Sequence, residues 1–124
     1  MTINADEARL LAQIGFLGIS RGALVDSKMI FEALSANRPD QEVGAIGRAL
    51  IELGAGNPAA ARDILAKARQ SEAVMSFSVL ANVLLGERDQ AAEILGELED
   101  IGASDEMIQM ARSAMDDTSA AGGK

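Results

Sequence analysis

The strongest constraint on the fold is a spacing of residues that the chain repeats three times. In each copy a glycine is followed by a small residue five positions later and by apolar residues nine and twelve positions later. The glycines stand at positions 22, 56 and 86, and such a period predicts a stack of equivalent supersecondary units. The copies read Gly22, Ser27, Phe31 and Leu34, then Gly56, Ala61, Leu65 and Ala68, and then Gly86, Ala91, Leu95 and Leu98.

Each glycine-anchored segment is preceded by a second stretch with helical spacing. The first such stretch covers residues 5–19, and Asn4 and Glu7 are spaced as a capping pair at its start. The second is expected to open at Asp40, directly after Pro39. Each unit is therefore predicted to be a helix, a glycine-containing turn and another helix.

The other helix starts carry capping signals too. Ser71 can cap the third preceding stretch, which runs to about Leu85, and Asn57 with Pro58 can open the helix of the second glycine segment. Ser104 is followed by two acidic residues, which suit the positive end of a helix dipole, and it predicts a seventh helix. We expect an all-α chain with three helical hairpins and a C-terminal capping helix.

The composition agrees with this fold class. Aromatic residues make up 2% of the chain and hydrophobic residues 48%, so the core must consist of Ala, Leu, Ile, Val and Met. Such residues favour helices over a sheet. The length of 124 residues predicts one domain, which we place at residues 1–116. The acidic, Gly-rich tail 117–124 is expected to be disordered.

The charge makes nucleic acid and lipid headgroups unfavourable partners. The net charge is −8 and the isoelectric point is near 4.4, so phosphate backbones and anionic membrane surfaces would repel the chain. The start MTINADEARLL lacks a basic segment followed by an apolar run, as a leader would have. The longest uncharged run, at positions 73–86, is too short to span a bilayer. With no cysteine, the composition is compatible with the cytoplasm, where we expect the protein.

Nothing in the sequence indicates an enzyme. The chain has no His, Cys, Tyr or Trp, which removes the usual general base, thiol nucleophile and transition-metal ligands. Carboxylates cluster at Glu97, Glu99 and Asp100 and at Asp116 and Asp117, but these lie in polar runs typical of solvated surface. The segment GAGNPAA lacks the lysine of a phosphate loop. We therefore expect no catalytic residues, no metal and no cofactor.

The helix expected at residues 73–85 is apolar on two sides. Its two stripes are Met75, Val79 and Val83, and Phe77, Leu80 and Leu84. Neighbouring repeats can cover both sides, or one stripe can form the floor of a groove for a partner helix. Either stripe can face the groove, and we expect Phe77, Leu80 and Leu84 to do so. The expected groove then comprises Phe16, Ile19, Ile46, Leu50, Phe77, Leu80 and Leu84.

The last helix carries Met107, Met110 and Met115 along one face. Methionine adapts its shape and recurs on surfaces that bind apolar helices. The same face can instead serve to lay a capping helix against the third repeat, which is the interpretation that we favour.

The repeated unit resembles the tetratricopeptide repeat, a helical hairpin of about 34 residues. The turn glycine, the small residue of the second helix, the larger apolar residue four positions on and Pro39 carry the resemblance. Three features depart from it: no aromatic residue lies early in a first helix, Arg48 replaces an apolar residue, and the third unit is shorter by four positions. The register of the first helices stays open by one position. The resemblance implies a solenoid whose packing positions are Gly22, Ser27, Phe31, Gly56, Ala61, Leu65, Gly86, Ala91 and Leu95.

The N-terminal part of the chain, positions 1–70, also resembles the needle-subunit chaperones of bacterial type III secretion, and related proteins of plant-pathogen (Hrp-type) secretion systems. The segments LLAQIGFLGISRGALVDSKMIFEALSANRPD and GNPAAARDILAKA carry this likeness. It implies a cytoplasmic chaperone whose solenoid holds an amphipathic helix of the needle protein, with or without a second small chaperone, and prevents premature assembly. A homo-oligomer is compatible with this role. The alternative is a general tetratricopeptide adaptor or self-assembling scaffold.

Overall fold

The computed structural model describes residues 3–39 and 41–116. These residues form seven helices and no strand, so the expectation of an all-helical chain is confirmed. The helices are α1 (Ala5–Ser20), α2 (Leu24–Asn37), α3 (Val43–Gly54), α4 (Pro58–Lys67), α5 (Glu72–Leu84), α6 (Arg88–Asp100) and α7 (Asp105–Asp116). The tail 117–124, which the sequence predicts to be disordered, lies outside the described residues.

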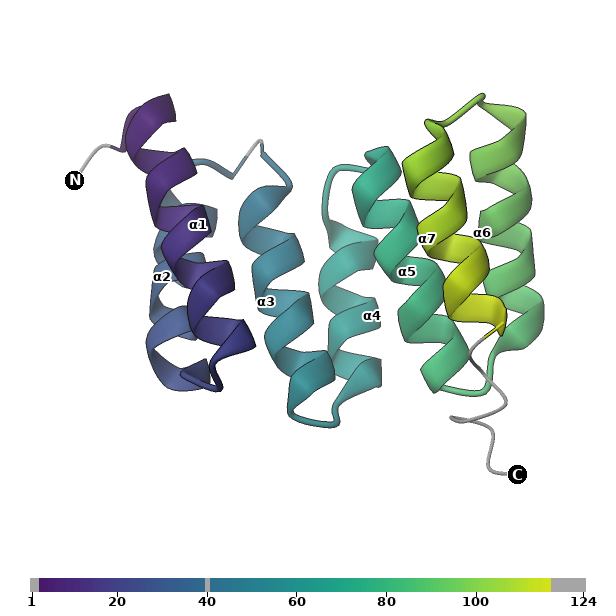
Figure 1. Ribbon diagram of the computed structural model, residues 1–124, viewed down its shortest axis with the longest axis horizontal. Coiled ribbons are helices and arrows are strands. Elements are labelled where there is room, and N and C mark those ends of the chain that lie inside the picture. Colours follow the sequence, from purple (N-terminus) through teal and green to yellow (C-terminus); the bar gives the residue numbers. More distant parts are fainter. Residues whose placement is uncertain (1–2, 40, 117–124) are drawn as a thin grey trace.

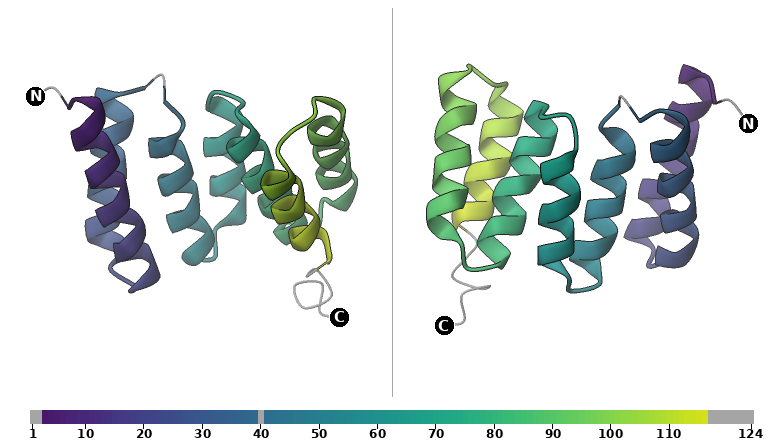
Figure 2. Two further views of the ribbon diagram at one scale, coloured as in Figure 1. Left: turned by 45° about the horizontal axis from the view of Figure 1, so that its top comes forward. Right: turned by 180° about the vertical axis from the view of Figure 1, so that it is seen from behind.

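The helices form two layers (Figure 1). The odd-helix layer contains α1, α3, α5 and α7, and each of these helices contacts the next one in the layer. The even-helix layer contains α2, α4 and α6, which stand apart when the molecule is seen from behind (Figure 2). Across the described ranges, no helix of the even-helix layer contacts another helix of that layer. Each helix also contacts the one that follows it in the chain, so the fold is a stack in which only near neighbours touch.

The hydrophobic core is divided into three clusters along the stack. The first lies among α1, α2 and α3, the second joins α3, α4 and α5, and the third joins α5, α6 and α7. Their buried residues are Ile3, Ala8, Ala12, Phe31, Leu34 and Ile51, then Ile46, Ala49, Ala61, Leu65, Val74 and Ala81, and then Val79, Val83, Ala91, Leu98, Ala103 and Ala111. Each cluster fills the space between successive hairpins, so the repeat in the sequence corresponds to a repeat in the packing.

The turns of the three hairpins are alike. Gly22, Gly56 and Gly86 have φ angles of 81°, 82° and 81°, a left-handed conformation that favours glycine. After each of them, the N–H of the next residue donates to the carbonyl four residues before the glycine, at 2.8 Å in all three turns. This is the Schellman arrangement that ends a helix. Gly102, with φ of 69°, makes the same bond at 3.0 Å between α6 and α7. The last helix thus follows α6 through a fourth turn of the same kind.

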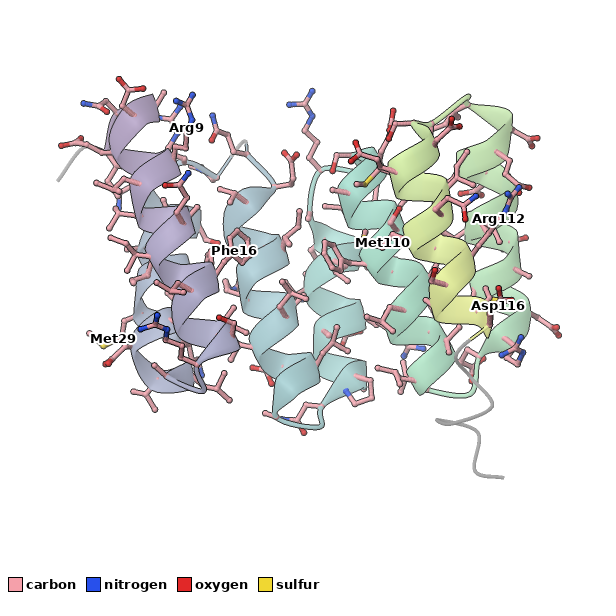
Figure 3. The ribbon with its side chains drawn as sticks, viewed as in Figure 1. Arg9, Phe16, Met29, Met110, Arg112 and Asp116 are labelled. Carbon is pink, nitrogen blue, oxygen red and sulfur yellow. The ribbon has the colours of Figure 1, made fainter. Side chains whose placement is uncertain are left out.

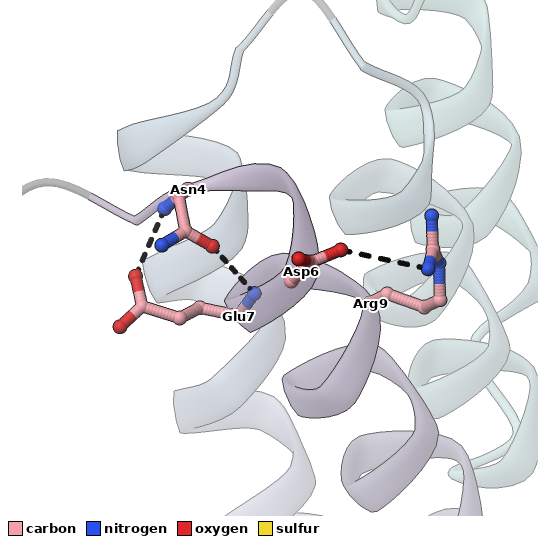
Figure 4. A network of polar contacts seen from close by, with 4 residues as sticks. All are labelled: Asn4, Asp6, Glu7 and Arg9. Atoms are coloured by element: carbon pink, nitrogen blue, oxygen red, sulfur yellow. Dashed lines mark hydrogen bonds and ion pairs between the residues drawn. The ribbon is translucent and has the colours of Figure 1, made fainter.

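Three of the expected helix caps are present. At the start of α1, the backbone N–H of Glu7 donates to Asn4 Oδ1 at 2.8 Å, and the N–H of Asn4 donates to Glu7 Oε1 at 3.0 Å (Figure 4). Ser71 Oγ accepts from the N–H of Val74 at 3.2 Å, and Ser104 Oγ accepts from that of Met107 at 3.4 Å. The starts of α1, α5 and α7 are therefore those that the sequence predicts.

The helix α4 begins at Pro58, as predicted, but one expected cap bond and one expected helix start differ. Asn57 does not cap α4, because its side chain turns back and donates to Glu52 Oε1 at 3.2 Å instead. The helix that precedes the second glycine-anchored segment was expected to open at Asp40, which lies outside the described residues. The observed helix, α3, begins only at Val43. The reason is a turn that precedes it, in which the N–H of Gln41 donates to the carbonyl of Arg38 at 3.1 Å.

Phe31 of α2 is fully buried between bare backbones of α1 and α3. A Cβ atom on Gly15 would lie 2.6 Å from the ring of Phe31, and one on Gly47 would overlap it. The ring of Phe16 is tilted by 51° against that of Phe31, with 4.8 Å between the centroids. Two glycines thus allow three helices to close around one aromatic ring.

Candidate partner-binding surface

A row of half-buried apolar side chains crosses the odd-helix layer. Phe16 of α1, Leu50 of α3 and Phe77 of α5 all pack against the second core cluster without being fully covered. Phe16 lies on the side of α1 that faces α3 (Figure 3). The row therefore joins three successive helices of one layer, and all three side chains rest on the second core cluster.

Leu80 and Leu84 extend this row along α5. They follow Phe77 at three and seven positions, so the three side chains share one side of the helix. Leu80 is half-buried and Leu84 is 41% exposed. The other stripe of α5 packs inward, because Val79 and Val83 belong to the third core cluster and Met75 packs against it; their side chains contribute to the contact with α6 and α7.

The remaining two expected groove residues lie deeper. Ile46 is 8% exposed and belongs to the second core cluster, so it is part of the interior and not of an open surface. Ile19 is half-buried and packs against the first cluster. The open part of the expected groove thus comprises Phe16, Leu50, Phe77, Leu80 and Leu84.

A hollow of about 270 Å³ lies between α1 and the start of α3. Alanines of α1 form much of its wall, and their short side chains leave it open. Arg9 stands at its edge, where its guanidinium is 3.6 Å from a carboxylate oxygen of Asp6 (Figure 4). Phe16 follows Ala12 and Arg9 along the same helix at helical spacing, so the hollow points toward the half-buried row. The lining residues are Ala5, Ala8, Arg9, Ala12, Gln41 and Val43.

The expected packing positions of the repeat fall into two groups: Gly22, Gly56 and Gly86 are exposed turn residues, and the others are buried or half-buried. Ser27, Ala61 and Ala91, the small residues of the three units, are at most 1% exposed. Ser27 also donates its hydroxyl proton to the carbonyl of Gly15 at 2.9 Å, a bond inside the first hairpin. Among the larger residues four positions on, Phe31 and Leu65 are fully buried and Leu95 is half-buried. The third unit is thus less deeply covered than the first two.

Arg48, which departs from the tetratricopeptide pattern, lines a second hollow. This hollow, of about 210 Å³, lies among α2, α3 and α4, on the side where the helices of the even-helix layer do not meet. Lys67 and Arg69 share its lining. Arg48 is half-buried, and the hollow leaves room for its long side chain.

The methionines of α7 are half-buried: Met107, Met110 and Met115. The helix packs on α5 and α6, with Ala111 fully buried at the contact. Ser76 of α5 donates its hydroxyl proton to the carbonyl of Met107 at 3.0 Å, and Arg112 forms an ion pair with Glu99 of α6 at 2.6 Å. The helix α7 thus covers the C-terminal end of the stack.

A third hollow, of about 390 Å³ among α4, α5 and α6, contains two carboxylates, Glu87 and Glu97. Glu87 directly precedes α6 and Glu97 lies in its last turn, so ten residues of helix separate their backbones by about 15 Å. Carboxylates that act together in hydrolysis lie roughly 5–10 Å apart, so these two do not form such a pair. In the described ranges, no group of three or more His, Cys, Asp or Glu side chains is placed to hold a metal ion.

Sequence reasoning missed the close approaches at Gly15, Gly44 and Gly47, where a Cβ atom would press on α2. It also missed the hollow between α1 and α3. The signal for both was present in the spacing of small residues: Ala5, Ala8 and Ala12 recur at helical intervals, as do Gly44 and Gly47. Small residues at such intervals mark the side of a helix that another element approaches closely.

Comparison with known protein families, with curated proteins and with solved structures finds no match to this chain. None of the helices in the described part has the length and hydropathy that crossing a bilayer requires. The half-buried row and the hollow beside it are therefore the features on which a functional proposal rests.

Proposed function

We propose that the protein is a non-enzymatic binding module built as a tetratricopeptide-like solenoid, and that the odd-helix layer is its inner, partner-binding side. Two features support the solenoid: the three hairpins end in the same glycine turn, and only near neighbours touch. Among the described helices, contacts within a layer occur in the odd-helix layer alone, which supports a stack that curves toward that side. The inner side of a solenoid is its usual binding surface.

The observation that carries this proposal is the half-buried row of Phe16, Leu50 and Phe77. Apolar side chains that pack on a core and remain partly open match the anchors that dominate protein interfaces. The chemistry fits an amphipathic helix, whose apolar residues would lie on the row at three- and four-residue spacing. A large side chain of that helix would enter the hollow beside Ala8 and Ala12.

The client that we propose is the needle subunit of a type III secretion system, held by its amphipathic helix in the cytoplasm before assembly. The resemblance of the N-terminal part of the chain, positions 1–70, supports this choice. The protein would work without cofactor or metal, alone or with a second small chaperone. A general tetratricopeptide adaptor or scaffold is the alternative, and the same surface would serve it.

Co-expression with the needle subunit of the same genome tests the proposal. The wild-type chain should co-purify with the subunit and keep it from polymerising. Leu80→Asp places a charge on the half-buried row and should abolish co-purification while the helical circular dichroism signal is retained. Val79→Asp is the matched control one residue away: it buries a charge in the third core cluster and should unfold the chain.

The outcomes separate the alternatives. Loss of needle binding in a folded Leu80→Asp chain supports the chaperone. The adaptor is supported if the folded wild-type chain does not bind the needle subunit but binds a helix of another protein, and if Leu80→Asp abolishes that binding. Client binding that survives Leu80→Asp, Phe77→Asp and Leu50→Asp alike would remove the odd-helix layer as the binding surface.

A further inference from the structure

The first hairpin exposes most of the large apolar side chains that face solvent. Of seven exposed large hydrophobic residues in the described ranges, five belong to α1 and α2. Leu10, Ile14 and Leu17 of α1 are 58%, 48% and 50% exposed, and Val25 and Met29 of α2 are 76% and 65% exposed. Figure 3 shows Met29 at the outer edge of this end of the stack. Scattered exposed leucines are ordinary, but a concentration on one hairpin marks an interaction surface.

The three residues of α1 form one stripe. Their spacing of four and three places them on a single side of the helix, opposite the buried residues Ala8 and Ala12. The helix is therefore apolar on two opposite sides. Phe16 lies roughly 120° around the helix from the middle of the stripe, so the stripe is separate from the client surface proposed above.

This stripe lies at the end of the stack that no described helix covers. At the C-terminal end, α7 packs on α5 and α6. At the N-terminal end, α1 contacts only α2 and α3 among the described helices. The terminal repeats of a solenoid normally present a polar outer face to water. An apolar stripe at this position indicates that another helix completes the stack.

The charges around the stripe specify which helix fits. Asp6 lies four residues before Leu10 on the same side of α1, and Arg21, which directly follows the last residue of the helix, lies four positions after Leu17. Asp6 is 91% exposed and its contact with Arg9 spans 3.6 Å, and Arg21 takes part in no ion pair of the described residues. Along this side the order is one acidic residue, three apolar residues and one basic residue. This order is complementary to itself when two copies run antiparallel.

We infer that the protein forms a homodimer through α1, with two copies of the helix packed antiparallel about a two-fold axis near Ile14. Leu10 of one copy then lies opposite Leu17 of the other, and Asp6 lies opposite Arg21. A parallel pairing would bring like charges together at both ends. Because the two-fold axis repeats every contact, the interface has two apolar pairs and two ion pairs around the central isoleucines. The two client surfaces stay open.

Analytical ultracentrifugation of the full chain over a micromolar concentration range tests this inference. The wild-type chain should sediment with twice the chain mass of 12.9 kDa. Ile14→Glu should give a monomer with unchanged helical content, since the side chain already faces water in the single chain. Ile101→Glu is the matched control: it replaces an apolar side chain that is 61% exposed at the other end of the stack, and it should stay dimeric.

A charge exchange tests the antiparallel arrangement. Asp6→Lys alone and Arg21→Asp alone should each weaken the dimer severalfold, and the double variant should restore it. The length of α1 separates the two positions by about 22 Å, so a rescue cannot act within one chain. The inference would be overturned if the double variant did not restore the dimer, if the wild-type chain were a monomer, or if Ile14→Glu left the dimer unchanged. If the monomer instead binds a helix of a different protein through Ile14, that protein is the occupant and the homodimer is wrong. Leu80→Asp should leave the dimer intact, which separates this test from that of the client surface.

Discussion

The ring of Phe31 in α2 fills the space that a side chain at Gly47 in α3 would occupy. On its other side the same ring lies against Gly15 of α1. The first hairpin thus docks on the second through an aromatic ring pressed between two bare backbones. The fit of the stack at this point depends on two residues that have no side chain.

Gly47→Ala should destabilise the fold. Alanine favours a helix over glycine by about 1 kcal/mol, but here its methyl group would displace the ring of Phe31, and overpacking of a core costs about 1–3 kcal/mol. Gly96→Ala is the matched control in α6, where a Cβ atom would meet nothing within 4 Å. That variant should gain about 0.5–1 kcal/mol. Urea unfolding measures both changes, and a stabilised Gly47→Ala chain would contradict the close packing.

Ala61→Leu should overpack the second core cluster. Ala61 is fully buried among α3, α4 and α5, and a larger side chain there should lower the free energy of unfolding by about 1–3 kcal/mol. Ala59→Leu makes the same change at an exposed position of α4 and should be nearly neutral. Thermal unfolding of the two variants side by side shows the difference. Equal stability of both would mean that position 61 does not lie at a helix contact.

Asn4→Ala should destabilise the chain more than Asn57→Ala does. Both residues precede helices, but only the side chain of Asn4 bonds to a backbone N–H of the helix that follows. Loss of a side-chain cap costs about 1 kcal/mol, and loss of the exposed bond between Asn57 and Glu52 should cost much less. Chemical denaturation checks the order, and hydrogen exchange in the first turn of α1 checks the site of the effect.

Client binding should survive high salt. Burial of apolar surface does not weaken as ions screen charges, so titration calorimetry from low to molar salt should show a nearly constant dissociation constant. In the same buffers the proposed dimer should weaken modestly, because its Asp6–Arg21 pairs are screened while its apolar contacts are not. A client affinity that collapses between low and moderate salt would show that the acidic surface holds the client.

Local chemistry made the helices predictable. Asn4, Ser71 and Ser104 mark helix starts by the bonds that their side chains make, and Gly22, Gly56 and Gly86 mark turns by the left-handed backbone that they adopt. The predicted start of α3 was wrong because a turn, closed by the bond from the Gln41 N–H to the Arg38 carbonyl, precedes the helix. The start of α4 at Pro58 was predicted correctly, but the cap bond from Asn57 was not, because the same side chain can bond to a nearby carboxylate as well as to a helix.

The site was harder to predict because burial depends on neighbours that the sequence does not place. Helical spacing groups Phe77, Leu80 and Leu84 on one side of α5, but it cannot tell which side faces another helix. Ile46 shows the limit: it has the spacing and character of a surface anchor, and it lies in the interior as part of the core shared with α4 and α5. Helical spacing likewise groups Leu10, Ile14 and Leu17 on one side of α1, and only the arrangement of helices shows that this side is open.

The two layers differ in which contacts between helices a change of curvature would alter. Successive helices of the odd-helix layer touch, whereas α2, α4 and α6 are joined to one another only through the odd helices between them. A change in the angle between two hairpins alters the contacts of α2 with α3 and of α4 with α5, but it breaks no contact between two even helices, because the described residues form none. A change of curvature at one hairpin adds to that of the next, so small local movements sum to a large change in the width of the inner side.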